Sequence, residues 1–81
     1  MRIVWDEPKR VANLQKRRLD FASLSLEFFA DAIAVPTRLG RFKAVWWFDG
    51  EPTTMIFKPL GTEALSVISM RRASCKERRL L

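Results

Sequence analysis

Hydrophobic positions along the 81-residue chain recur at two different spacings. Near the N-terminus, residues 3–5 form a short apolar run that predicts a strand. The apolar positions of residues 7–18 recur at helical spacing, and Asp6 offers an N-cap carboxylate at the start of this predicted helix. A second helix is expected after Asp20, because the large apolar side chains up to residue 28 continue the helical spacing.

The second half of the chain alternates instead. Residues 41–48 predict a strand with Phe42, Ala44, Trp46 and Phe48 on one face and Arg41, Lys43, Val45 and Trp47 on the other. A tight hairpin turn is predicted at residues 49–50, an Asp-Gly pair, and residues 53–58 then return as its partner strand. Further strands are expected at residues 30–35 and 65–70. The Ser-x-x-Glu pattern of residues 74–77 is a capping box that begins a short C-terminal helix.

The predicted order of elements, β-α-α-β-β-β-β-α, favours an α+β fold. We expect one compact domain over residues 1–81. Its antiparallel sheet has about four or five strands, packed with two N-terminal helices and a short C-terminal helix.

The lack of histidine excludes several classes of site. With no His and one Cys, the chain has no Ser-His-Asp triad, no Cys-His pair and no four-ligand zinc site of its own. No internal disulfide is possible, which suits a reducing compartment. No apolar run reaches the roughly 20 residues that span a bilayer, and no signal peptide is evident. We therefore expect a cytoplasmic protein without metal or cofactor, whose chemistry rests on Arg, Lys, carboxylates and hydroxyls.

The net charge of +6 gathers at the two ends of the chain. Residues 1–20 carry six basic and three acidic side chains, and residues 69–81 carry five basic and one acidic. The middle of the chain is nearly neutral and more apolar. This pattern favours basic terminal elements that bind phosphate groups, as in nucleic acid. The alternative is that these charges only solvate exposed helix faces.

Three stretches of the chain resemble the BrnT family of bacterial type II toxins. The most specific is the closing Ile-Ser-x-Arg-x-Ala-Ser-x-x-Glu-Arg of residues 68–78. Next is the opening Trp-Asp-x-x-Lys of residues 5–9, which is followed by Asn13-Leu14 and by residues 19–21. The third is Gly-Arg at residues 40–41 with the hairpin after it. The resemblance covers nearly the whole chain.

The resemblance implies a RelE-like fold and a metal-independent ribonuclease that arrests translation. It also implies a partner, a BrnA-like ribbon-helix-helix antitoxin, through which alone the toxin reaches operator DNA. Two other functions stay open. One is a catalytically weak or inactive homologue that serves as an antitoxin- or nucleic-acid-binding module, and the other is a structural interaction protein.

RNA cleavage without a metal needs cations that neutralise a phosphorane-like transition state, and an Arg fork meets two phosphate oxygens at once. Glu77 is the only carboxylate among the C-terminal basic residues, which suggests a proton acceptor. The candidate catalytic residues are Lys9, Arg41, Arg71, Glu77 and Arg78. The candidate RNA-binding residues are Asn13, Lys16, Arg17, Lys43 and Arg72.

Several of these residues have a simpler structural interpretation. Glu77 is explained by the capping box alone, and Arg71 by an ion pair with Asp6 or another carboxylate. Asn13 either holds a backbone group or contacts the antitoxin. Lys9 and Lys16 are equally well explained as an exposed helix face.

The chain departs from the family at two places. Where many members read Lys-His-Gly, this sequence has Lys16, Arg17 and Arg18. Arginine cannot act as a base near neutral pH, so the chain either cleaves RNA by charge and alignment or keeps the toxin's shape with diminished activity. Many members also have Gly near Trp46. The Trp46-Trp47 pair is expected to fill space over the sheet or to stack on a base.

Overall fold

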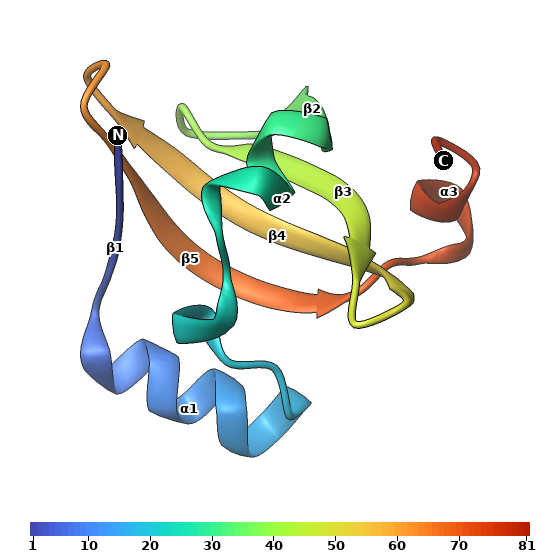
Figure 1. Cartoon of the computed structure of the whole chain (residues 1–81), viewed down its shortest axis with the longest axis horizontal. Helices are drawn as coiled ribbons and strands as arrows, with labels where there is room; N and C mark the ends of the chain where they lie inside the picture. Colours follow the sequence, from blue (N-terminus) through green and yellow to red (C-terminus); the bar gives the residue numbers. More distant parts are fainter.

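The computed structural model describes residues 1–81 and contains five strands, three α-helices and one short 3₁₀ helix (Figure 1). In chain order these are β1 (Arg2–Trp5), α1 (Glu7–Arg17), η1 (Phe21–Ser23), α2 (Leu26–Asp31), β2 (Ile33–Pro36), β3 (Phe42–Phe48), β4 (Glu51–Leu60), β5 (Ala64–Arg72) and α3 (Cys75–Arg78). None of the helices is long and apolar enough to cross a membrane.

The five strands form one sheet in the order β1-β5-β4-β3-β2. The strands β2 to β5 are joined by antiparallel pairs, which confirms the predicted α+β class. One detail of the prediction is wrong, because β1 pairs with β5 in parallel. A parallel pair needs a long connection, and here the whole chain from α1 to β4 lies between these two strands. The first and the last strand of the chain are thereby neighbours in one sheet.

Helix α1 has the ends that its sequence predicts. The Asp6 side chain accepts a hydrogen bond from the Lys9 backbone N–H at 3.3 Å, and Pro8 lies in the first turn. The helix ends at Arg18, which has the left-handed φ of 61° and donates its backbone N–H to the Leu14 carbonyl. This backbone region favours glycine, so arginine is held there against its own preference.

The second predicted helix is two separate elements. The Asp20 side chain accepts a hydrogen bond from the Ala22 N–H at 3.0 Å, but the turn it begins ends after η1, and Leu24 is extended. Helix α2 then begins after Ser25. Both pieces exist because each buries one aromatic ring: Phe21 is inaccessible and Phe28 is 6% exposed. The helical spacing predicted both buried positions correctly but did not predict the break between the two elements.

The β3–β4 hairpin confirms the predicted turn and alternation. Asp49 and Gly50 both have positive φ, 52° and 77°, as a two-residue turn of this kind requires. Phe48 pairs with Glu51 across it. Strand β4 then carries a register shift against β5, where Ile56 pairs with Ser69 and the next residue pairs with Val67. This bulge leaves position 68 unpaired.

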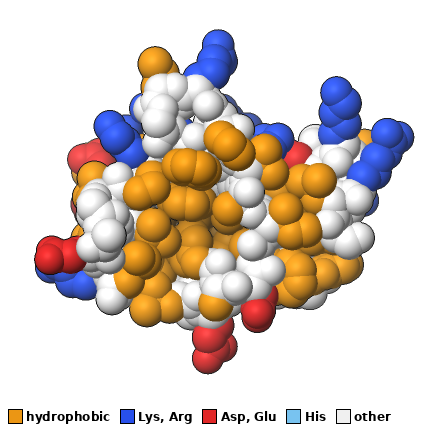
Figure 2. Space-filling view, turned by 90° about the horizontal axis from the view of Figure 1, so that it is seen from above, with side chains coloured by type: hydrophobic (Ala, Val, Ile, Leu, Met, Phe, Trp, Pro, Cys, Tyr) orange, Lys and Arg blue, Asp and Glu red, His pale blue; other side chains and the backbone are white.

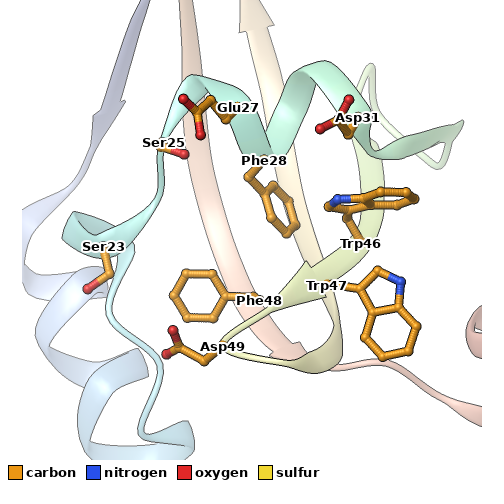
Figure 3. Close-up of a pocket in the computed structure, with 9 residues that line it drawn as sticks. All are labelled: Ser23, Ser25, Glu27, Phe28, Asp31, Trp46, Trp47, Phe48 and Asp49. Carbon is orange, nitrogen blue, oxygen red and sulfur yellow. The ribbon is translucent and has the colours of Figure 1, made fainter.

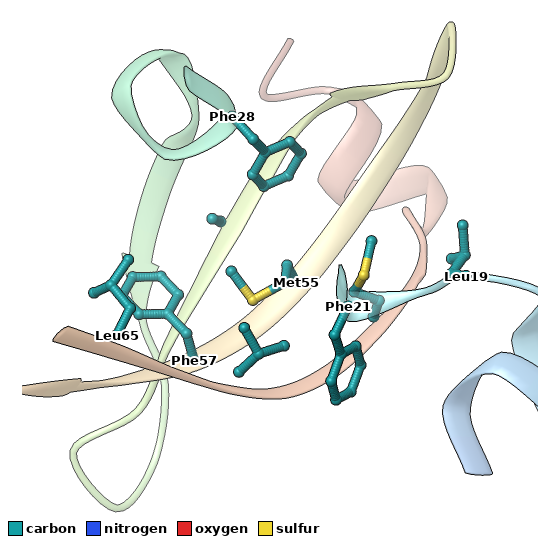
Figure 4. Close-up of a cluster of buried hydrophobic side chains, with 9 residues drawn as sticks. Leu19, Phe21, Phe28, Met55, Phe57 and Leu65 are labelled. Atoms are coloured by element: carbon teal, nitrogen blue, oxygen red, sulfur yellow. The ribbon is translucent and has the colours of Figure 1, made fainter. Parts of the chain in front are cut away.

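The core lies on one face of the sheet (Figure 4). The bulge matters here because it puts Val67 and Met70, three residues apart, on the same core face. The segment between α1 and β2 lies across this face and adds its own apolar side chains. The buried cluster consists of Leu19, Phe21, Phe28, Ala44, Met55, Phe57, Leu65, Val67 and Met70. Each large side chain buried here contributes about 1.5–3 kcal/mol relative to its exposed state.

Two sets of side-chain contacts join α1 to the rest of the fold. Arg10 pairs with Glu7 at 2.6 Å and with Asp20 at 3.1 Å, and Glu7 also accepts from the Trp5 indole N–H at 3.0 Å. The Asn13 amide nitrogen donates to the Leu19 carbonyl, and its oxygen accepts from the Met70 backbone N–H at 3.1 Å. These contacts fix α1 against β5.

The opposite face of the sheet is partly covered by α3. Val45 and Thr54 point to this face and are fully buried, although they lie outside the main core. The short helix begins at Ser74, with both hydrogen bonds of the predicted capping box in place. Its one buried residue is Glu77, which is 3% exposed. A carboxylate therefore lies at the centre of this second, small interior.

We expect Arg18→Gly to stabilise the fold, because glycine adopts the left-handed φ without strain. The strain of about 1–2 kcal/mol is partly offset by the greater unfolded-state entropy of glycine, which leaves a gain of about 0.5–1 kcal/mol. Thermal unfolding followed by circular dichroism then gives a Tm about 2–8 °C higher. Lys16→Gly, at an exposed position inside α1, is the control and lowers stability by about 1 kcal/mol. A lower Tm for Arg18→Gly contradicts the expectation.

Candidate active site

A basic cavity of about 410 Å³ opens on the face of the sheet that α3 partly covers. It is built from the ends of β3, β4 and β5 and from the loop that precedes β3. Its lining residues are Thr37, Arg38, Leu39, Arg41, Lys43, Ile56 and Arg71. Four of these seven side chains are cations and none is an anion.

Strand register brings these residues together. Lys43 lies opposite Ile56 on β4, and Arg71 on β5 lies opposite Thr54, so three strands present side chains to one area of this face. The loop before β3 closes on itself, because the Thr37 N–H donates to the Arg41 carbonyl at 2.8 Å. Arg41 is thereby held at the mouth of the cavity, where it is half-buried.

Glu77 lies beneath this cavity and accepts five hydrogen bonds. Arg71 binds it through both ends of the guanidinium, with Nη1–Oε1 of 2.6 Å and Nη2–Oε2 of 2.9 Å. Lys43 Nζ is 3.1 Å from Oε2, and the Thr54 hydroxyl donates to Oε1 at 2.8 Å. The Ser74 backbone N–H also donates to Oε1 at 2.9 Å. One carboxylate thus connects β3, β4, β5 and α3.

These bonds decide what Glu77 can do. The Arg71 guanidinium, helped by the Ser74 N–H, the Thr54 hydroxyl and Lys43, holds the pKa of Glu77 well below its usual range, against the opposing effect of burial. The same pair raises the pKa of Arg71. A carboxylate has acceptor sites for about four hydrogen bonds, and five donors already occupy them. Glu77 is therefore suited to orient Arg71 and Lys43 and poorly suited to accept a substrate proton.

The ten candidate residues fall into three groups in the structure. Arg41, Lys43, Arg71 and Glu77 come together as described. Two others are bonded within the fold: Asn13 bridges two backbone groups, and Arg72 donates to the Thr53 hydroxyl at 2.7 Å and pairs with Glu51. Arg71 has the carboxylate partner that its structural interpretation required, but this partner is Glu77 rather than Asp6.

The remaining candidates lie outside the cavity. Lys9, Lys16 and Arg17 are exposed on α1, and Arg78 is exposed on α3. Figure 1 shows α1 and α3 at different ends of the molecule, so the two basic ends of the chain do not form one surface. In Figure 2, hydrophobic side chains form a broad centre, most of the visible Lys and Arg side chains lie along the upper and right-hand margins, and acidic side chains project at the lower and left-hand margins.

Two residues at this site were not among the candidates. Arg38 lines the cavity from a loop whose sequence predicts only a turn. The alternation of β4 places Thr54 two residues from Ile56 and so on the same face, but only the strand register puts its hydroxyl beside Glu77. Nowhere does the structure group three or more His, Cys, Asp or Glu side chains as ligands for a metal ion.

We expect the contribution of Glu77 to stability to depend on pH. Its folded-state pKa lies below the unfolded value of about 4.3, so the stabilisation is fully present above that pH and is lost as the pH falls toward the folded-state pKa. Glu77→Gln therefore costs about 1–3 kcal/mol near pH 7, and this difference shrinks at about pH 2–3. Urea unfolding at several pH values measures it. Glu63→Gln, at an exposed position, is the control, and a difference for Glu77→Gln that does not change with pH contradicts the expectation.

The family of the chain follows from two comparisons. A family model described as "Ribonuclease toxin, BrnT, of type II toxin-antitoxin system" matches residues 5–77, from the tryptophan that ends β1 to the buried glutamate of α3. No curated protein sequence matches the chain.

Among solved structures, the chain is similar to the Brucella abortus ribonuclease toxin BrnT, whose crystal structure has a resolution of 1.1 Å. The two are 55% identical, with a TM-score of 0.86, over 91% of this chain and 97% of that one. The confirmed element order, the basic cavity and these matches agree, and the chain belongs to the BrnT family of ribonuclease toxins of type II toxin-antitoxin systems.

Proposed function

We propose that this chain is an endoribonuclease that cleaves RNA at the basic cavity without a metal ion and so arrests translation. The observation that supports this most directly is the convergence of Arg38, Arg41, Lys43 and Arg71 on one cavity. Four cations without a lining carboxylate suit the phosphates of a polyanion. The ribonuclease activity of the Brucella relative is consistent with the same chemistry.

The reaction that fits this site is attack of the RNA 2′-hydroxyl on the adjacent phosphate. Negative charge then increases on the phosphate oxygens, and cations already held in place stabilise it without reorganising. Arg41 has no side-chain partner within the chain and is free to bind a phosphate oxygen through its fork. Arg71 and Lys43 are each held by Glu77, Arg71 Nη1 also donates to the Arg72 carbonyl, and both side chains line the cavity.

Glu77 acts in this proposal as a positioning residue. Because its oxygens are occupied and its pKa is lowered, it does not take the proton of the attacking hydroxyl. Thr54 supports the same arrangement from β4 through its 2.8 Å hydrogen bond. The site then works by alignment and charge, as expected for a chain that has Arg17 at the position of the family's histidine.

The remaining parts of the proposal concern partners. In this proposal a BrnA-like ribbon-helix-helix antitoxin neutralises the toxin, and the toxin contacts operator DNA only through that antitoxin. Expression in a bacterium should arrest growth, and co-expression of the adjacent antitoxin gene should restore it. Normal growth with folded, abundant protein would overturn the toxin activity.

We expect Arg41→Ala to reduce cleavage of a single-stranded RNA substrate by about 10²–10³-fold in kcat, because one transition-state donor is lost. The Arg41 side chain makes no bond within the chain, so the circular dichroism spectrum and Tm should stay unchanged. Arg79→Ala, which removes an exposed cation outside the cavity, is the matched control and should retain full activity. Equal loss in the two variants would mean that only overall charge matters.

A second candidate is a weak or inactive homologue that binds antitoxin or nucleic acid. The full occupation of Glu77 by donors within the chain favours it, since no other carboxylate approaches the cavity. In that case RNA binds without being cleaved, and log affinity falls with log salt at a slope of about −0.7 per phosphate contacted on a single strand. A cleavage assay alongside this titration separates the two functions.

A further inference from the structure

A second pocket, of about 300 Å³, lies between α2 and the end of β3, away from the basic cavity (Figure 3). Its walls hold four aromatic rings, Phe28, Trp46, Trp47 and Phe48, together with Glu27, Asp31, Asp49 and two serines. No Lys or Arg lines it. The chain has a net charge of +6, but all the charged side chains that line this pocket are acidic.

The aromatic rings are partly available to a ligand. Trp47 is 50% exposed, and Trp46 is half-buried against the core. Phe28 and Phe48 form an edge-to-face pair with ring centroids 6.4 Å apart. Trp46 lies on the same face of β3 as Phe48 and packs against the core, whereas the Trp47 ring lies on the opposite face of the strand. The tryptophan ring that this pocket offers to a ligand is therefore that of Trp46.

The three carboxylates lie around these rings. Figure 3 shows Glu27 and Asp31 projecting from α2 on one side and Asp49 on the other side, next to Phe48. None of the three forms an ion pair with another part of the chain; Asp6 and Glu63 also form none, whereas Glu7, Asp20, Glu51 and Glu77 do. Their negative charge is left for a group from outside.

We propose that this pocket binds an arginine side chain presented by a segment of a partner protein, which in the proposed toxin-antitoxin system is the antitoxin. A planar guanidinium stacks on the face of a tryptophan ring, here Trp46, and donates to carboxylates at its edge, so one side chain uses both kinds of wall. The identity of the partner rests on the proposed function, but the chemistry of the pocket does not.

The same features argue against RNA as the occupant. A nucleobase also stacks on tryptophan, but its phosphates would have to lie beside three carboxylates. RNA and the arginine-bearing segment therefore belong at different sites, the basic cavity and the acidic pocket. An antitoxin that binds the acidic pocket does not compete there with RNA, whose phosphates bind the basic cavity.

The direct test uses the folded protein labelled with ¹⁵N and the peptide acetyl-Gly-Arg-Gly-amide. The three tryptophan indole N–H signals are followed by NMR, and a Trp46→Phe variant assigns the pocket signal. We expect the Trp46 signal to shift saturably, while the signals of Trp47, on the opposite face of β3, and of Trp5, which is bonded to Glu7, stay in place. The neutral isostere acetyl-Gly-citrulline-Gly-amide should produce no comparable shift.

Variants of the carboxylates sharpen the test. Glu27→Gln and Asp31→Asn should each weaken peptide binding by about two- to fivefold, as expected for exposed charge pairs, and Glu63→Gln should leave it unchanged. No saturable shift with the arginine peptide, or equal shifts with the citrulline peptide, would overturn the proposal. A stronger response of the Trp46 signal to adenosine or uridine monophosphate would do so as well and would assign the pocket to RNA.

A cellular test addresses the partner. With antitoxin expression titrated from an inducible promoter, the double variant Glu27→Gln/Asp31→Asn should still arrest growth but should need more antitoxin for neutralisation than the Glu63→Gln toxin does. Neutralisation of the two variants at the same antitoxin level would exclude the antitoxin as the occupant. If the unaltered chain does not arrest growth, the proposed function fails, and the peptide titration alone then decides the pocket.

Discussion

The contact on which the rest of the site depends is the two-bond fork between Arg71 and Glu77, at 2.6 and 2.9 Å. Glu77 is 3% exposed, and a buried carboxylate is costly unless its oxygens are satisfied. Here donors from three strands and from the helix cap satisfy them. The capping interaction and the site interaction are one arrangement, because the N3 residue that begins α3 is also the residue that fixes Arg71 and Lys43.

This arrangement explains how a four-residue helix stays in place. Helix α3 is too short to be stable by its own hydrogen bonds, and most of its side chains are exposed. The ionic contacts of Glu77, together with Val45 and Thr54 beneath it, attach the helix to the sheet. The same contacts leave the cations of Arg71 and Lys43 pointing at the cavity with less freedom than a surface side chain has. The contacts that attach the C-terminal helix to the sheet therefore also fix the Arg71 and Lys43 side chains at the cavity.

The charge of the molecule is divided between its surfaces. Arg38, Arg41, Lys43 and Arg71 meet on one face, while Glu27, Asp31 and Asp49 lie around Trp46 beside α2. Because the two signs are separated, a polyanion can bind away from the carboxylates and a cationic protein segment can bind away from the cations, so neither is repelled by its site. The exposed cations of α1 and of Arg78 lie outside both sites and contribute to the general positive field.

The sequence by itself determined the α+β class, the ends of α1, the Asp49-Gly50 turn, the capping box at Ser74 and the facing of β3, because each depends on residues near one another in the chain. The resemblance of residues 5–9 and 68–78 to the BrnT family likewise needed no structure. Tertiary structure decided the rest: the parallel pairing of β1 with β5, the break before α2, and the strand register that places Thr54, Lys43 and Arg71 around Glu77. Charge along the chain located the basic excess at the two termini, and the fold places these at different ends of the molecule. Local patterns predict backbone conformation and burial, but which charges meet depends on contacts between residues far apart in the chain, such as Lys43 with Glu77, 34 positions later.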